Sequence, residues 1–156
     1  MEINPYEKIW IGITIAAVIF MLAAITLASF GLGASLPGAA GSVDPRILVQ
    51  QPPFNTPGLF QLSQGKYQAI MIASAWAFNP NTMRVPVGSE ITFKVTSRDV
   101  THGMLIEGTN VNLMILPGQI AEATHKFNKA GTYLFVCHEY CGTGHQTMSG
   151  KIIVTP

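Results

Sequence analysis

The hydrophobic pattern divides the chain into an apolar stretch, a segment without periodicity, and a region of short alternations. Residues 9–30 form a run of 22 residues without a charge, rich in Ile, Ala, Leu and Val. At about 1.5 Å per residue, a helix of this length spans about 33 Å, enough to cross a hydrocarbon core of about 30 Å. Tyr6 and Trp10 near its start are typical of a membrane–water interface. The pattern predicts one transmembrane helix over 9–30.

The charges around this stretch predict its orientation. Lys8 precedes it, and the next charged residue is Asp44. By the positive-inside rule, residues 1–8 would be cytoplasmic and the rest of the chain would lie outside. A cleaved signal peptide ending near Ala34 or Ala40 is the alternative. It would have a basic start and a shorter apolar core of about 7–15 residues, which favours the retained anchor.

Residues 31–64 are dense in Gly, Pro, Ser and Asn, without hydrophobic periodicity. The prolines at 37, 45, 52, 53 and 57 exclude a continuous helix. We expect a Pro/Gly-rich linker that drapes over a partner or over the following domain, since so long a structureless loop is unusual inside a compact fold.

From residue 65 to 156 the pattern changes to short strands separated by turns. In 90–97, for example, Ile91, Phe93 and Val95 alternate with polar residues. The predicted strands are 67–73, 82–86, 90–97, 103–107, 112–116, 120–127, 132–136 and 151–154. Short strands at this spacing favour an antiparallel sandwich or barrel.

Composition excludes several classes of protein. The formal net charge is +1, and from Asp44 onward eight basic and six acidic residues leave a net of +2, so no nucleic-acid partner is indicated. The sequence contains no C-x-x-C-H motif for covalent haem, and no phosphate-binding loop or nucleophile elbow.

The candidate chemistry lies in one stretch near the C-terminus. Both cysteines of the chain, Cys137 and Cys141, occur there four residues apart, followed by His145 and Met148. Thiolate, imidazole and thioether form a soft set of metal ligands. A mononuclear blue-copper site needs one Cys, one nearby His, a weak Met and a second His from elsewhere. The extra cysteine could hold a second copper.

This stretch resembles the CuA loop of subunit II of haem–copper oxidases, with the pattern C-x-E-x-C-G-x-x-H-x-x-M complete. The upstream stretch from Asp99 to His102 resembles the segment that carries the family's other histidine ligand. The resemblance covers the chain from about Tyr67 to the C-terminus and weakly the N-terminal helix, and it is closest to the B-family (ba-type) subunits. It implies a cupredoxin-like Greek-key barrel or sandwich behind a single transmembrane helix.

The resemblance also implies a set of ligands for two copper ions. Cys137 and Cys141 would bridge both ions, and His102 and His145 would each bind one. Met148 and the backbone carbonyl of Glu139 would be the weak ligands. From the residues alone, a Cys137–Cys141 disulfide and a tetrahedral Cys2His2 zinc site remain alternatives, and Met148 could be a core residue.

Four further residues carry hypotheses that come from the resemblance. The Glu139 side chain could face the catalytic subunit and help bind a cation. Trp76 and Phe78 could belong to an apolar docking face for the electron donor, with core packing as the alternative. Glu7 could gather protons at a cytoplasmic uptake path, or be a juxtamembrane charge without a role.

Two other histidines are assigned no ligand role. We expect His125 at the surface, and His138 beside the ligands in a supporting or solvent-exposed role.

The resemblance implies an electron-entry subunit in a prokaryotic plasma membrane, with its copper domain on the outer face. Cytochrome c would donate electrons, and the haem-containing subunit I would receive them and reduce oxygen to water. This chain would have no catalytic pocket of its own. The alternatives are the copper subunit of a CuA-containing nitric oxide reductase and a membrane-anchored copper chaperone. A chaperone of this type would have a thioredoxin-like fold, which the strand pattern does not predict.

Overall fold

The computed structural model describes residues 4–32, 38 and 40–156. They form a long helix and a β domain, two units that are described separately below. Residues 1–3 of the expected cytoplasmic N-terminus, and 33–37 and 39 of the expected linker, lie outside the described residues.

Helix α1 (Pro5–Leu32) begins before the predicted start at residue 9 because its first turn is capped. The Asn4 side chain accepts a hydrogen bond from the Tyr6 amide at 3.0 Å, and the Glu7 carboxylate accepts one from the Asn4 amide at 3.2 Å. This reciprocal arrangement satisfies amides that have no partner inside a helix, and Pro5 at the first helical position needs none.

The apolar surface of α1 is unpaired within the described part of the chain. Every described side chain from 4 to 30 is exposed, and the helix is long and apolar enough to cross a membrane. The hydroxyls of Thr14 and Thr26 donate to carbonyl oxygens one turn earlier, those of Trp10 and Leu22, at 2.9 and 2.7 Å. These polar groups are therefore satisfied without water, as a lipid environment requires.

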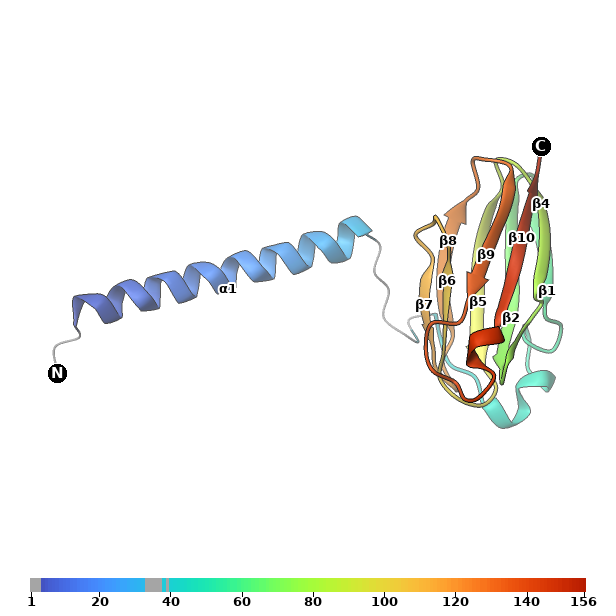
Figure 1. Cartoon of the computed structure of the whole chain (residues 1–156), viewed down its shortest axis with the longest axis horizontal. Coiled ribbons are helices and arrows are strands. Elements are labelled where there is room, and N and C mark those ends of the chain that lie inside the picture. Colours follow the sequence, from blue (N-terminus) through green and yellow to red (C-terminus); the bar gives the residue numbers. More distant parts are fainter. Residues whose placement is uncertain (1–3, 33–37, 39) are drawn as a thin grey trace. The chain divides into compact units, whose positions relative to one another are not determined.

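The β domain is a sandwich of two sheets (Figure 1). The strands within the described residues are β1 (Gly58–Ser63), β2 (Lys66–Ser74), β3 (Ala77–Asn79), β4 (Thr82–Pro86), β5 (Glu90–Ser97), β6 (His102–Ile106), β7 (Asn112–Ile115), β8 (Ala121–Lys126), β9 (Gly131–Val136) and β10 (Ser149–Thr155). One sheet has the order β1-β2-β5-β8, with β3 beside β2, and the other has the order β4-β10-β9-β6-β7. The predicted all-β sandwich is confirmed.

Two strand pairs differ from the expected antiparallel pattern. β2 pairs with β5, and β10 with β4, in parallel. The chain leaves β2, contributes β4 to the other sheet, and returns to lie beside β2 as β5, so the two strands run in the same direction. The main core fills the space between the sheets, and the inward positions of β5 are the predicted Ile91, Phe93 and Val95, all fully buried.

Residues 41–56, called the strap here, cover the outer face of the first sheet. The Ile120 amide donates to the Gly41 carbonyl at 2.9 Å, and the Val43 amide to the Gly118 carbonyl at 3.1 Å. Farther along, the strap contains the short 3-10 helix η1 (Pro45–Gln50). Leu48 and Phe54 are buried against β2 in a second apolar cluster, separate from the main core.

The strap and β1 place the start of the β domain before the predicted boundary at residue 65. The strap is anchored by only two apolar side chains, and two are too few to produce a hydrophobic periodicity in the sequence. The expectation that this segment drapes over the domain agrees with its packing.

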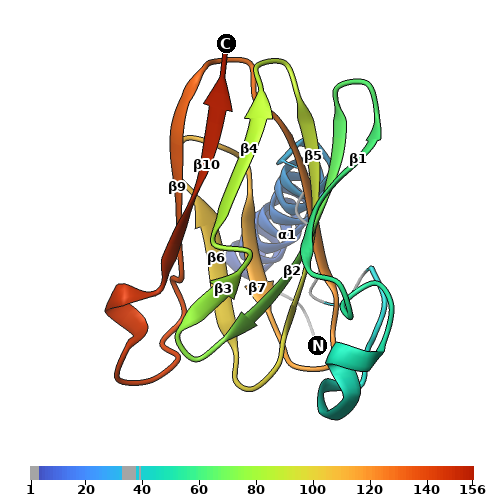
Figure 2. The same ribbon diagram turned by 90° about the vertical axis from the view of Figure 1, so that its right-hand side faces the viewer.

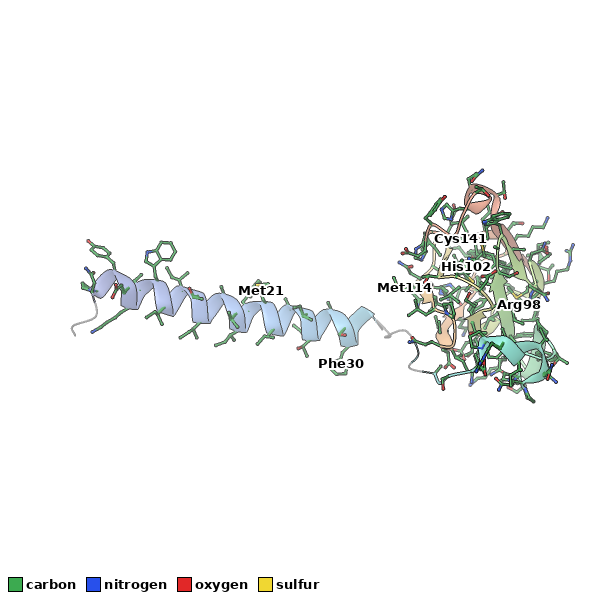
Figure 3. All side chains as sticks on the ribbon, turned by 90° about the horizontal axis from the view of Figure 1, so that it is seen from below. Met21, Phe30, Arg98, His102, Met114 and Cys141 are labelled. Atoms are coloured by element: carbon green, nitrogen blue, oxygen red, sulfur yellow. The ribbon has the colours of Figure 1, made fainter. Side chains whose placement is uncertain are left out.

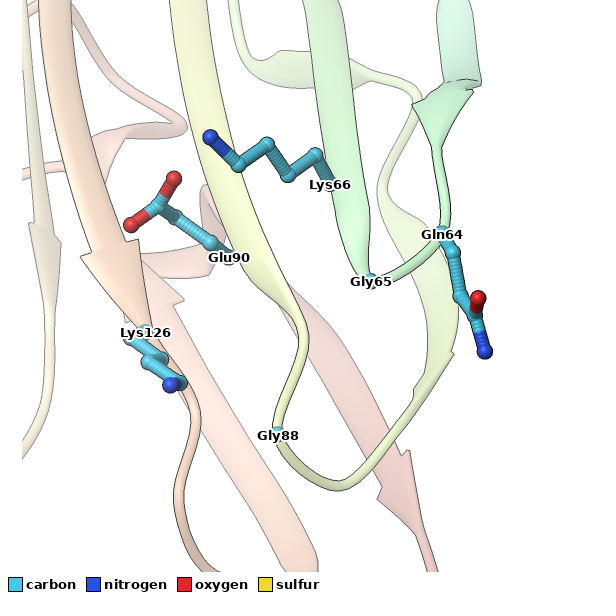
Figure 4. Close-up of a pocket in the computed structure, with 6 residues that line it drawn as sticks. All are labelled: Gln64, Gly65, Lys66, Gly88, Glu90 and Lys126. Carbon is cyan, nitrogen blue, oxygen red and sulfur yellow. The ribbon is translucent and has the colours of Figure 1, made fainter.

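The two ends of the sandwich differ in their chemistry. The loop 137–148 lies at one end, together with the turns after β2 and β5, while the C-terminus lies at the other (Figures 1 and 2). The far end carries a pocket lined by Gln64, Gly65, Lys66, Gly88, Glu90 and Lys126 (Figure 4). That lining offers no thiol, imidazole or thioether, whereas both thiols of the chain lie at the first end.

Candidate metal centre

The two thiols lie side by side at the end of the main core. Cys137 directly follows β9, and its amide donates to the carbonyl of Met148 at 3.0 Å, which closes the base of the loop 137–148, called the metal loop here. Both cysteines are free and only 7% exposed, and their Sγ atoms are 3.8 Å apart. A disulfide bond measures about 2.05 Å. The structure therefore shows two separate thiols.

Each thiol has its own imidazole. His102 Nδ1 lies 3.9 Å from Cys137 Sγ, and His145 Nδ1 lies 3.6 Å from Cys141 Sγ. His102 opens β6, more than thirty residues before the metal loop, and Figure 3 shows it beside Cys141. The ligand atoms of His102 and the two cysteines all lie within 4.8 Å of one another, a spacing that could hold a metal ion.

The two weak donors lie beside the same sulfurs. The Met148 Sδ is 3.7 Å from Cys141 Sγ, and the carbonyl oxygen of Glu139 is 3.3 Å from Cys137 Sγ. Met148 is buried. The structure thus brings all six sequence-predicted ligands together, and their binding of a metal remains a prediction.

Burial determines the protonation of one of the thiols. Burial of Cys141, reinforced by the neighbouring Cys137, raises the pKa of its thiol to about 11. The thiol therefore holds its proton at neutral pH, and an arriving metal ion must displace it.

Asp99 orients His102. Its Oδ1 lies 2.8 Å from His102 Nε2, which leaves Nδ1 directed at Cys137. The carboxylate also accepts hydrogen bonds from the amides of Ala75 and Val100, each at 2.7 Å. Burial acts to raise the pKa of Asp99, but the hydrogen bonds from His102 and the two amides outweigh it and hold that pKa below its usual value. A carboxylate behind a metal-binding imidazole fixes the ring and makes it a better ligand.

Trp76 covers the metal loop from outside. Its indole nitrogen donates to the Cys141 carbonyl at 3.0 Å, and its ring occupies the space beside Gly142 and Gly144. The side chain remains 43% exposed. Trp76 thus connects the metal loop to the protein surface. Tyr140, 79% exposed, lies at the same loop with its ring 5.9 Å from that of His145.

Phe78 does not share that surface. It is 3% exposed and packs edge to face against Phe135 in the main core. Its burial removes it from any docking face and corrects that part of the sequence-based hypothesis. The phenylalanine follows the pattern of β3, in which the middle residue points inward.

The remaining sequence-predicted residues occupy separate places. Glu7 caps α1, His125 is half-buried on β8 with its Nδ1 2.5 Å from the Asn110 side chain, and the Glu139 carboxylate is 40% exposed. His138 packs against Gly103 on β6.

Sequence reasoning did not assign roles to Asp99 or Gly103. The D-x-x-H spacing could have indicated the role of Asp99. The role of Gly103 depends on a contact with His138, 35 positions away in the sequence.

Comparisons with known proteins show the family of the chain. The family described as "Cytochrome C oxidase subunit II, periplasmic domain" matches residues 62–155. One cytochrome c oxidase subunit 2 of Thermus thermophilus is 39% identical over 156 residues, covering 97% of this chain and 93% of the relative. A second subunit 2 from the same species is 40% identical over 133 residues, covering 84% of this chain and 98% of the relative.

Solved structures show the same fold. A chain from the cryo-EM structure of a haem–copper terminal oxidase dimer has a TM-score of 0.74 at 34% identity, covering 96% of this chain and 99% of that chain. The periplasmic domain of subunit II of the Bradyrhizobium japonicum oxidase has a TM-score of 0.53 at 24% identity, covering 56% and 83%, and supports the cupredoxin-like fold alone.

Proposed function

Because this chain belongs to the family of cytochrome c oxidase subunit II, we propose that its metal loop holds a dinuclear copper (CuA) centre. As a subunit of a haem–copper terminal oxidase, the chain is part of an oxidoreductase complex with partner subunits. In the proposed function, this subunit would receive electrons from a cytochrome c and pass them to haem in subunit I, where oxygen would be reduced to water.

One observation carries the dinuclear assignment. Two free thiols lie 3.8 Å apart, each with a different imidazole nitrogen within 4 Å. A mononuclear blue-copper site uses one thiolate, and a zinc site has no use for the buried Met148 thioether next to Cys141. Two thiolates with one imidazole each match two metal ions that share both sulfurs.

The roles of the residues follow from this arrangement. Cys137 and Cys141 would bridge, His102 and His145 would each bind one ion, and Met148 and the Glu139 carbonyl would be weak ligands. When bound, the dinuclear copper supplies a one-electron carrier whose charge is shared over two metals.

The chain supplies a rigid and dry setting for those ligands. His102 is fully buried and held by Asp99, and the cysteines and Met148 belong to the main core. Ligands fixed by packing and hydrogen bonds move little when the charge changes, which favours fast electron transfer.

Trp76 is the proposed point of electron entry. It is exposed at the surface and hydrogen-bonded to the backbone of a bridging cysteine. With a net charge of only +2 from Asp44 onward, the domain offers little electrostatic steering, so donor docking would be mainly apolar and weakly dependent on salt.

The family and the charge pattern together support a proposal for the orientation in the membrane. The chain is anchored by one apolar helix, and its family has an outward-facing periplasmic domain. We place the N-terminus in the cytoplasm, with Glu7 there as a candidate for proton uptake. In that arrangement electrons would enter on the outer side and protons on the inner side.

The test is to load the full chain with copper in detergent micelles, count the metal, and record optical and EPR spectra. We expect two copper ions per chain, a purple protein, and a mixed-valence signal with hyperfine splitting from both nuclei. A Cys141→Ser variant should lose the mixed-valence signal. A blue protein with one copper, or a colourless zinc protein, would contradict the proposal.

The alternative functions are not favoured. The relatives reported above are cytochrome c oxidase subunits, and the β sandwich differs from the thioredoxin-like fold expected of a chaperone.

A further inference from the structure

His138 lies between two proposed ligand residues and rests on the strand that carries a third. A Cβ built on Gly103 would lie 2.5–2.6 Å from three atoms of the His138 ring, so the ring occupies the place that any other side chain would need. Gly103 directly follows His102 in β6. The imidazole therefore packs onto the backbone next to a buried ligand.

The same ring also contacts the next residue of the metal loop. His138 Nδ1 lies 3.5 Å from a carboxylate oxygen of Glu139. The carbonyl oxygen of Glu139 is the one 3.3 Å from Cys137 Sγ. His138 thus touches both the strand of His102 and the residue that offers the weak oxygen ligand.

Little else holds this part of the loop. Within the described part of the chain, the backbone amides of residues 138–140 form no hydrogen bond. The Tyr140 side chain is 79% exposed and gives little anchorage. The described side-chain contacts next to the Glu139 carbonyl are those of His138, a residue that is exposed as a whole but whose side chain is 28% exposed.

We propose that His138 is a positioning residue of the copper centre. Packed on Gly103 and in contact with Glu139, it holds the Glu139 carbonyl at the metal and fixes the spacing between the metal loop and the His102 strand. This inference rests on the proposed function.

The test compares copper-loaded full-length variants in detergent by EPR, optical spectra, redox titration and copper loss to a chelator. In His138→Ala we expect altered copper hyperfine splitting, a shifted reduction potential, and copper loss faster by about tenfold, the lower end of the effect of removing residues that support metal ligands. His138→Phe keeps a ring on Gly103 and should restore most of the spectrum, with a smaller shift in potential from the lost nitrogen.

Two further variants separate this role from general stability. Gly103→Ala should displace the ring and change the spectrum as His138→Ala does, but it should add little in the His138→Ala background, where the space is free. His125→Ala removes a half-buried histidine on β8 and should leave the spectrum and potential unchanged.

The outcomes are distinguishable. If His138→Ala lowers only the unfolding temperature, with unchanged spectrum, potential and copper loss, His138 is a packing residue and the inference is wrong. If the wild-type chain itself gives no mixed-valence signal, the proposed function fails instead, and this inference falls with it.

Discussion

At the scale of single residues, Asp99 orients the imidazole of His102, a proposed copper ligand. Its carboxylate is fixed by the amides of Ala75 and Val100 and lies against His102 Nε2. The ring is buried, so its orientation depends on this neighbour more than on water. The Asp99 carboxylate thus links the turn after β2, the turn after β5 and the imidazole of His102.

Replacing Asp99 by Asn keeps the size of the side chain but turns one accepting oxygen into a donor. One of the contacts to His102 or the amides must then be lost. We expect copper affinity to fall by roughly 10- to 100-fold, the range for residues that support metal ligands. Competition with a chelator of known affinity measures the copper affinity. Asp44→Asn is the matched control, because that carboxylate pairs with Arg46 and touches no ligand. Equal losses in both variants would show that Asp99 has no special role.

Gly144 determines where Trp76 can lie. Its φ of −94° and ψ of 7° suit any residue, so the backbone itself does not demand glycine. A Cβ there, however, would lie 2.5 Å from an atom of the indole ring. The ring, and with it the hydrogen bond to the Cys141 carbonyl, would have to move.

We therefore expect Gly144→Ala to lower the free energy of unfolding of the β domain by about 1–3 kcal/mol, the usual cost of overpacking. It should also slow electron transfer from cytochrome c to the copper-loaded chain. Urea unfolding and stopped-flow reduction measure the two effects. In a Trp76→Ala background the added methyl has room, so Gly144→Ala should then change stability little; a full additional loss there would disprove the clash.

At the scale of elements, the strap is held by its own small core. Phe54 is fully buried and Leu48 is 1% exposed, and both pack on Ile70 and Ile72 of β2. Three of the proposed ligands, Cys137, Cys141 and Met148, belong to the other cluster, between the sheets. Stability and metal binding can therefore be changed separately.

Phe54→Ala should cost about 3–5 kcal/mol in the free energy of unfolding of the β domain, as for other buried Phe truncations. The spectrum of the copper-loaded chain should stay unchanged. Phe60→Ala on the adjoining β1 is the control, since that ring is 42% exposed and its loss should cost about 1 kcal/mol or less. Urea unfolding monitored by fluorescence tests both, and similar costs for the two would mean that the strap is not anchored as described.

The elements that sequence reasoning found are those with a regular pattern. β5 was predictable because its apolar residues recur at every second position, and the eight expected strands are all present. β1 and β3 were missed, and so were the buried anchors of the strap, Leu48 and Phe54. β3 has only one buried residue, and the strap has its two main anchors six positions apart, so neither gives a period.

In the candidate site, too, the features with a regular sequence spacing were predictable and the others were not. The metal-loop ligands are close in sequence, and their spacing alone indicated a soft metal site. The Gly103–His138 and Gly144–Trp76 contacts arise only when distant segments meet at one end of the sandwich, and composition gives no sign of them. Phe78 was misjudged because an aromatic residue near a site looks alike in sequence whether it faces solvent or the core.

At the scale of the whole molecule, the chain combines an apolar helix, unpaired among the described residues, with a β domain that has its own core. The domain holds every proposed copper ligand, whereas the helix contributes none. The only acidic side chain described in α1 is Glu7, in its first turn. If the helix does more than anchor the domain, Glu7 is where that role would be found.

Glu7→Gln tests this with little structural cost. A glutamine at the third helical position can accept the Asn4 amide as glutamate does, so the cap is kept while the charge is lost. If Glu7 gathers protons, oxygen reduction by the assembled oxidase should fall, most at alkaline pH, where free protons are scarce. Steady-state turnover in liposomes measures this, with Glu2→Gln as the control for loss of a nearby negative charge. Unchanged turnover across the pH range would leave Glu7 with capping as its only role. A fall confined to Glu7→Gln, with copper reduction by cytochrome c unaffected, would show that this subunit serves proton entry as well as electron entry.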